Sequence, residues 1–273
     1  EPFRAGLDLR VLDGPQAGPA ATRNRLIEVA RGELLLLLND DVVPQPGLLR
    51  AHLEAHAGRG EPAMVLGGAP FAPTARDSLF DRLIRETSMV FFYDRMTGED
   101  PARDWGFRHA WTLNLSVPTR CVRAVGGFCE ALPGAAYEDI ELAWRLRERF
   151  GAPVLYRPRA RVIHEHAYEP GGYLRREETL GRDAGALAIA NPECALELFG
   201  RDITSEEELA YCAQYVERER AGVERLRETF ESWATTPADL VPASVVRALY
   251  EHHLPLKRWH WRRGRLAGAP QLV

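Results

Sequence analysis

Leu34-Leu35-Leu36-Leu37-Leu38-Asn39-Asp40-Asp41-Val42-Val43-Pro44 is the stretch that decides the fold. Five leucines in succession show no period-two alternation, so neither face of a strand at this place can lie in water. The run predicts a central strand of a sheet that helices cover on both sides. It ends at two carboxylates, and ligands of open α/β sheets bind at the carboxyl ends of the strands.

The paired carboxylates Asp40 and Asp41 allow two interpretations. Hard divalent cations prefer oxygen ligands, so the pair is well placed to hold one. The alternative is a polar turn in which Asp41 caps the helix that follows.

Helix and strand signals alternate around the leucine run. Residues 9–12 predict a short strand and residues 19–31 a helix. After the leucine run, residues 47–57 predict a second helix and residues 63–67 a second buried strand. This order predicts an α/β fold with a mostly parallel sheet flanked by helices.

Two later segments have patterns of their own. Residues 77–96 carry an amphipathic pattern that is typical of a long helix. Residues 111–117 alternate apolar and polar side chains, which predicts a strand with one face buried and one face in solvent.

Composition bounds the class of protein. The chain has 273 residues, of which 45% are hydrophobic and 27% charged, so it is typical of a globular protein. A net charge of -4 gives no field that would favour nucleic acid. The apolar runs are too short to span a bilayer and no secretory signal opens the chain. The four cysteines lack the spacing of metal ligands, so we expect free thiols in a reducing cytoplasm.

A second group of chemically active side chains lies at Glu138 and Asp139. They open an apolar-patterned helix, residues 138–150, together with Glu141. Acidic side chains in a first helical turn complement the helix dipole, which would explain them without any catalytic role. The alternative is a general base at the rim of a cleft.

His164 and His166 lie two residues apart, on one face of a predicted strand. They are either structural hydrogen-bonding residues or a pair of metal ligands.

Four segments stand in the order and at the spacing seen in family-2 glycosyltransferases of the GT-A fold. They are residues 18–24, residues 39–44, residues 114–116 with 125–128, and residues 138–139 running into 161–164. The chain resembles bacterial members of this family over residues 8–167. The resemblance implies that residues 1–167 form a GT-A-like (Rossmann-like) catalytic domain. Because family members usually open with a strand, a helix and a second strand, we expect this domain to be N-terminally incomplete.

The resemblance assigns roles to the acidic motifs. It implies that Asp41 holds a divalent metal, Mn²⁺ or Mg²⁺, which bridges the diphosphate of a sugar nucleotide. Asp40 would lie near the ribose and sugar of the donor. Asn39 stands where many members carry a further aspartate, and an amide is a weaker ligand for a hard metal. Asp139 matches the catalytic base, with Glu138 beside it.

Further positions follow from the same resemblance. His164 matches a histidine that completes the metal site in several relatives. Gly126 and Gly127 would form a turn close to donor and acceptor. Arg23 and Asn24 would contact the donor.

The implied reaction is the inverting transfer of a sugar from a nucleotide-diphosphate sugar to an acceptor hydroxyl. The acceptor would be a glycan, a lipid-linked sugar or a small molecule. Two other functions stay open: a metal-dependent hydrolase that uses Asp40, Asp41, His164 and His166, and a non-catalytic or degenerate interaction domain.

Residues 168–273 differ in character, being rich in Glu and Arg, and predict a helical C-terminal extension. Leu209, Val216, Val223 and Phe230 recur every seven residues, which favours either a helix packed on the catalytic domain or a homodimeric coiled coil. Residues 252–265 are basic and aromatic. They are either a solvated end or a peripheral contact with anionic lipid, so we expect a cytoplasmic protein with or without membrane association.

Overall fold

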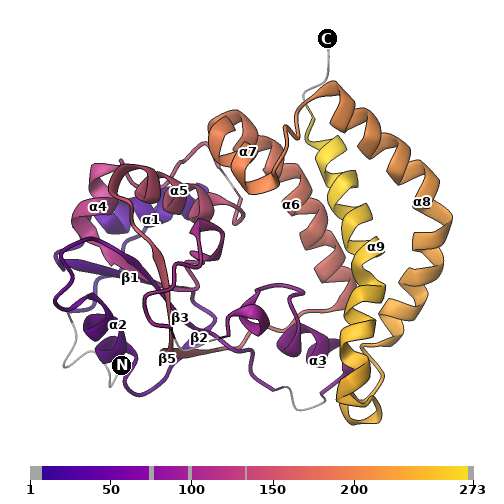
Figure 1. Cartoon of the computed structure of the whole chain (residues 1–273), viewed down its shortest axis with the longest axis horizontal. Helices are drawn as coiled ribbons and strands as arrows, with labels where there is room; N and C mark the ends of the chain where they lie inside the picture. The colour runs from indigo at the N-terminus through magenta and orange to yellow at the C-terminus, as the bar shows by residue number, and fades with distance from the viewer. Residues whose placement is uncertain (1–7, 74–76, 98–99, 133, 270–273) are drawn as a thin grey trace.

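The computed structural model describes residues 8–73, 77–97, 100–132 and 134–269. Its sheet region lies beside a layer of long helices, with α3 (Leu79–Glu86) between the two (Figure 1). The sheet region contains α1 (Gly18–Val29), β1 (Leu34–Leu38), β2 (Val42–Pro44), α2 (Leu48–His56), β3 (Met64–Gly68), β4 (Asn114–Pro118), α4 (Thr119–Ala124), α5 (Glu138–Phe150) and β5 (Val154–His164). Two single-turn helices, η2 (Tyr93–Arg95) and η3 (Phe107–His109), lie in the connection from α3 to β4.

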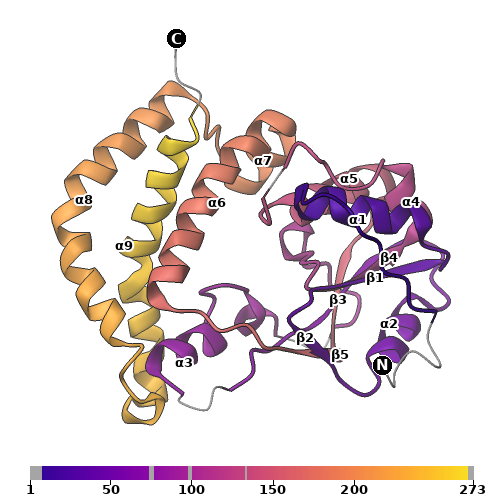
Figure 2. The same ribbon diagram turned by 180° about the vertical axis from the view of Figure 1, so that it is seen from behind.

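The sheet is mixed. Its strand order is β1-β4-β3-β5-β2, and among the described strands only β3 and β5 pair in parallel. The α/β class and the flanking helices are confirmed, whereas the expectation of a mostly parallel sheet was wrong. Helices α1, α4 and α5 lie on one face and α2 on the other (Figures 1 and 2).

The leucine run forms β1, but this strand lies at the edge of the sheet. Among the described residues it pairs only with β4, and four of its leucines are half-buried while Leu38 is 38% exposed. The prediction of a central strand was therefore wrong. An apolar run predicts that a strand has little contact with water, but it does not say which strands pair with it.

The opposite correction applies to β4. The alternating pattern predicted a half-exposed strand, yet Asn114, Leu115, Ser116 and Val117 are all buried. β4 lies between β1 and β3, and α2 covers its polar face. The polar side chains are tolerated there because they are hydrogen-bonded.

A buried polar network fixes β4 to its neighbours. The Asn114 amide donates to the carbonyl oxygens of Gly68, at 3.2 Å, and Ala160, at 2.9 Å. Its Oδ1 lies 2.9 Å from Nε2 of His52, whose Nδ1 lies 2.8 Å from Oγ of Ser116. The network links β4 to β3, β5 and α2.

Replacing Asn114 by leucine is expected to lower the free energy of unfolding by about 2–4 kcal/mol, because buried carbonyls and an imidazole nitrogen lose their partners. Chemical denaturation measures the change. The matched control is Gln214→Leu on an exposed helical face, where we expect a change within about 0.5 kcal/mol. Equal losses in both variants would show that the network contributes nothing specific.

Two other elements differ from the sequence predictions. Residues 9–12 are exposed and belong to no strand, and the helix expected over residues 77–96 ends at Glu86, before η2. A strand needs neighbours to supply its hydrogen bonds, and no described strand lies beside residues 9–12.

The C-terminal region is helical, as predicted. It comprises α6 (Pro170–Ala190), α7 (Pro192–Phe199), α8 (Glu206–Ser232), the single turn η4 (Ala238–Leu240) and α9 (Ala243–Ala267). α9 packs between α6 and α8 (Figures 1 and 2). At the α6–α9 crossing a Cβ added to Gly181 would lie 1.9 Å from the Trp261 carbonyl oxygen, so only glycine permits this approach.

Some of the residues proposed for dimerisation and lipid contact are packed inside the chain, whereas Arg258 and Arg263 are exposed. Val223 and Phe230 of the heptad seam are buried in a core that α3, α6, α8 and α9 share. Trp259 is 8% exposed and Arg265 is fully buried, so these two side chains are packed within the chain. Among the described residues, no helix is both long and apolar enough to cross a membrane.

Candidate functional site

The turn between β1 and β2 brings Asp41 to the end of β5. β2 pairs antiparallel with β5, with Val42 opposite His164. Oδ2 of Asp41 lies 3.2 Å from Nε2 of His164 and 3.2 Å from Nδ1 of His166. Ligand atoms of these three side chains all lie within 4.8 Å of one another. The predicted ligands Asp41 and His164 are thus brought together, and His166 joins them.

The donor atoms of this cluster suit a divalent metal. Within the described part of the chain, Oδ1 of Asp41 and Nδ1 of His164 are buried and have no hydrogen-bond partner. Burial lowers the pKa of His164, while the nearby Asp41 carboxylate opposes the shift. The neutral imidazole that burial favours is the form that binds metals.

The other two residues of the turn lie outside the cluster. Asp40 is exposed and Asn39 is half-buried. Neither has a side-chain partner among the described residues, which leaves both free to meet a ligand.

Asp139 lies in the first turn of α5, as expected. Its Oδ1 accepts a hydrogen bond from the Ile140 backbone N–H at 2.8 Å, and its Oδ2 a long one from that of Thr112 at 3.4 Å. Burial raises the pKa of Asp139, and the charge of Arg23 opposes the shift. A carboxylate with a raised pKa is better matched to proton abstraction near neutral pH.

Glu138 is more deeply buried and has one strong partner. Its Oε1 accepts from Nη1 of Arg23 at 2.6 Å, and its side chain is 4% exposed. Burial raises the pKa of Glu138 to about 7, the charge of Asp139 adds to the shift, and Arg23 opposes it.

The residue before this pair is conformationally strained. Tyr137 has φ +69°, and it is the non-glycine residue with positive φ within the described ranges. Its ring packs edge-on against Phe199 of α7, and Trp261 of α9 donates a hydrogen bond of 3.5 Å to its hydroxyl. Helices of the C-terminal region therefore hold the backbone at the start of the acidic pair, a contact that the sequence did not reveal.

Asn24 fixes the glycine turn rather than standing free. Its Oδ1 accepts from the Phe128 N–H at 2.7 Å and its Nδ2 donates to the Phe128 carbonyl at 2.9 Å. Gly126 and Gly127 have φ of +82° and +76°. A Cβ added to Gly127 would lie 2.4 Å from Oδ1 of Asn24, so this turn depends on glycine.

Gly127→Ala is expected to lower the free energy of unfolding by about 1–3 kcal/mol, because alanine meets both the strained backbone and the Asn24 side chain. Gly222→Ala is the control: nothing lies within 4 Å of an added Cβ there, and the position is in a helix. We expect the control to gain about 0.5–1 kcal/mol. Thermal or urea unfolding of both variants measures the two changes in stability. A Gly127→Ala protein as stable as the unmodified one would contradict the dependence of this turn on glycine.

Aromatic rings connect the metal-ligand cluster to the acidic pair. The ring of Phe91 lies 6.1 Å from that of His164 and 5.1 Å from that of Trp111. Trp111 precedes Thr112, whose N–H faces Asp139. Phe71 stacks on His164 at 4.5 Å. The sequence did not predict this aromatic wall of Phe71, Phe91 and Trp111, because single aromatic residues in irregular segments form no recognisable pattern.

A cavity of about 260 Å³ adjoins this aromatic wall. Phe71 and Phe91 line it together with Tyr93 and Tyr156. Three charged side chains, Arg85, Asp94 and Arg161, also line it.

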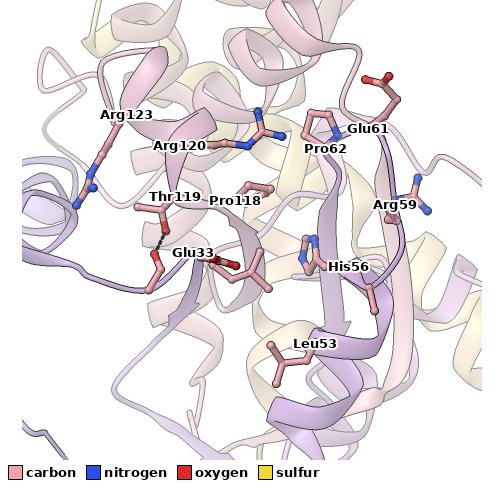
Figure 3. Close-up of a pocket in the computed structure, with 13 residues that line it drawn as sticks. Glu33, Leu53, His56, Arg59, Glu61, Pro62, Pro118, Thr119, Arg120 and Arg123 are labelled. Carbon is pink, nitrogen blue, oxygen red and sulfur yellow. Dashed lines mark hydrogen bonds between the residues drawn. The ribbon is translucent and has the colours of Figure 1, made fainter.

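A second cavity, of about 750 Å³, lies at the opposite end of β1 (Figure 3). His56, Arg59, Arg120 and Arg123 are among its lining residues. None of the residues predicted for the site lines it, so it is separate from the candidate site.

Comparisons with known proteins place the chain among glycosyltransferase sequences. Residues 3–112 match the model of glycosyl transferase family 2. The chain is 30% identical over 201 residues to a pre-mycofactocin glycosyltransferase of Mycobacterium tuberculosis, covering 69% of this chain and 39% of that protein. It is 32% identical over 146 residues to a validoxylamine A glucosyltransferase of Streptomyces hygroscopicus subsp. jinggangensis, covering 46% of this chain and 34% of that protein.

The chain thus spans about two fifths of the length of the mycobacterial relative. Among solved structures, TarS of S. aureus aligns with a TM-score of 0.43 and 14% identity, covering 93% of this chain and 72% of that chain.

Proposed function

Because the chain carries a glycosyl transferase family 2 domain in residues 3–112, we propose that it transfers a sugar from a nucleotide-diphosphate sugar to an acceptor hydroxyl, with inversion at the anomeric carbon. The observation that carries the proposal is the convergence of Asp41, His164 and His166 within 4.8 Å, beyond the end of β1. Asp139, at the start of α5, supplies the base.

Asp41, His164 and His166 would hold a divalent cation, and the bound cation supplies Lewis-acid stabilisation of the charge that develops on the leaving diphosphate. Two imidazoles beside one carboxylate favour Mn²⁺ over Mg²⁺, since Mg²⁺ is held mainly by carboxylates and water. Asn39, Asp40 and the Gly126–Gly127 turn are the proposed donor contacts.

Asp139 takes the proton of the acceptor hydroxyl as the hydroxyl oxygen attacks the anomeric carbon. Its hydrogen bond from Ile140 fixes the carboxyl plane, and its raised pKa lets it accept a proton near neutral pH. Attack on the side opposite the diphosphate inverts the anomeric configuration. The cavity beside Phe71 and Phe91 is the proposed acceptor subsite, because it joins apolar rings with a few charged groups.

The deciding experiment is a thermal-shift panel of UDP-, GDP- and dTDP-sugars with and without Mn²⁺ or Mg²⁺. UDP-glucose is a natural first donor, since one of the matched relatives is named a glucosyltransferase. Stabilisation by one nucleotide class, strengthened by Mn²⁺, would support the proposal, and nuclear magnetic resonance of the product would then report the anomeric configuration. Absence of any donor-dependent shift would favour the interaction-domain alternative.

A further inference from the structure

Arg23 is the cation that faces the Glu138–Asp139 pair. It comes from α1, more than a hundred residues earlier in the chain, and its own side chain is 19% exposed. Its Nη1 lies 2.6 Å from Oε1 of Glu138, and its guanidinium lies 5.4 Å from the centre of the Phe128 ring. Oε2 of Glu138 is buried and has no partner among the described residues.

Other charges near the pair are already neutralised or act on a neighbour. On α5 itself, Glu141 is paired with Arg145 at 2.6 Å. From α6, the charges of Arg176, Glu177 and Asp183 act on Tyr137, the residue before the pair. Among the described residues, Arg23 is therefore the cation whose charge lowers the pKa of both Glu138 and Asp139.

Two adjacent carboxyl groups, Glu138 buried and Asp139 half-buried, do not readily ionise together without a cation. A proton retained by such a pair is shared between the two carboxyl groups, so for part of the time it is bound to Asp139, the proposed base. The resemblance to known glycosyltransferases implied that Arg23 contacts the donor, and in the structure its side chain lies against Glu138.

We propose that Arg23 is a positioning residue, which holds Glu138 by an ion pair and so keeps the neighbouring Asp139 free of its proton and in place as the base. This inference rests on the proposed transfer reaction. It assigns Arg23 to the acceptor side of the chemistry and not to the binding of the donor.

The first test is the pH dependence of transfer in Arg23→Gln and Arg23→Lys. In Arg23→Gln we expect the acidic limb of the kcat profile to move up by about one pH unit or more, since an opposite charge at this distance lowers a carboxyl pKa by roughly 1–3 units. Arg23→Lys keeps a cation and should restore most of the shift. The donor Kd, measured by calorimetry, should change less than about twofold in both.

The second test needs no activity, so it separates this inference from the proposed function. The folded-state pKa of Glu138 lies above its ordinary value of 4.5, at about 7, so stability falls as pH rises between these two values. Without Arg23 the folded-state pKa rises further and the fall continues to higher pH. Arg23→Gln should therefore lose more stability at about pH 8 than at about pH 5, and adding Glu138→Gln should make the difference smaller, because only Asp139 then still depends on Arg23.

Arg25→Gln is the matched control, because Arg25 lies on the same helix and donates to the backbone oxygen of Asp13. We expect neither its pH–rate profile nor its stability profile to change. The inference is overturned if Arg23→Gln weakens donor binding more than about tenfold with an unshifted acidic limb. It is also overturned if the stability lost by Arg23→Gln is the same at both pH values.

Discussion

Asp139→Asn is expected to lower kcat by about 10²–10⁴-fold, the contribution that a positioned general base typically makes. The amide keeps the acceptor oxygen for the Ile140 N–H, so the backbone at the start of α5 should hold its conformation. It cannot take the acceptor proton. Initial rates over a range of acceptor concentrations measure the loss, and calorimetry with the donor should give an unchanged Kd.

Glu148→Gln is the control for this substitution. It removes a carboxylate from the same helix, at a side chain that is 51% exposed and paired with Arg147. We expect its kcat to stay within about twofold of the unmodified protein, since exposed ion pairs contribute little. Undiminished turnover in Asp139→Asn would show that Asp139 is not the base. Weaker binding of the donor to this variant would indicate that Asp139 contacts the donor.

Asp41→Ala is expected to abolish the stabilisation by Mn²⁺ and to lower transfer by about 10²-fold or more, because charge stabilisation by a bound metal is worth several kcal/mol. In the unmodified protein a Mn²⁺ concentration of about 100 times its Kd should add about 2.7 kcal/mol to the free energy of unfolding. Thermal unfolding with and without Mn²⁺ measures the difference.

We expect the two histidines of the proposed metal site to differ in their effect on the stability of the metal-free protein. His166 is exposed, so His166→Ala should fold normally and weaken Mn²⁺ binding without changing stability in the metal-free protein. His164 is buried against Phe71, so His164→Ala should lose some stability as well as metal binding. His252→Ala, an exposed histidine on α9, is the control. An unaltered Mn²⁺ response in Asp41→Ala and in both site variants would exclude this cluster as the metal site.

Local sequence signals predicted several elements and motif positions correctly. The run of leucines forms a strand, the acidic pair opens a helix, and Ser205 caps α8 by accepting from the Glu208 N–H at 3.2 Å. These features depend on neighbours a few residues away, and such short-range preferences can be read directly from the chain. Asp41 and His164 were also predicted together, although only from the resemblance to a known family.

Strand order was decided by the tertiary structure. The pattern of Leu34–Leu38 indicated a buried strand, and that of Asn114–Val117 a half-exposed one, yet the first lies at the edge and the second is enclosed. Hydrophobicity reports how well a side chain tolerates burial, whereas pairing decides which strand is covered. The polar residues of β4 are buried because His52 and two backbone carbonyls satisfy them.

By itself the sequence determined the α/β class and the helical C-terminal region, and it predicted the residue types that a metal site and a base would require. Only the tertiary structure decided which side chains face one another. Arg23 meets Glu138, Asn24 meets Phe128, and Tyr137 rests on Trp261. Each of these contacts joins segments more than a hundred residues apart, so its geometry depends on the packing of the helices around the sheet and not on any local pattern in the chain.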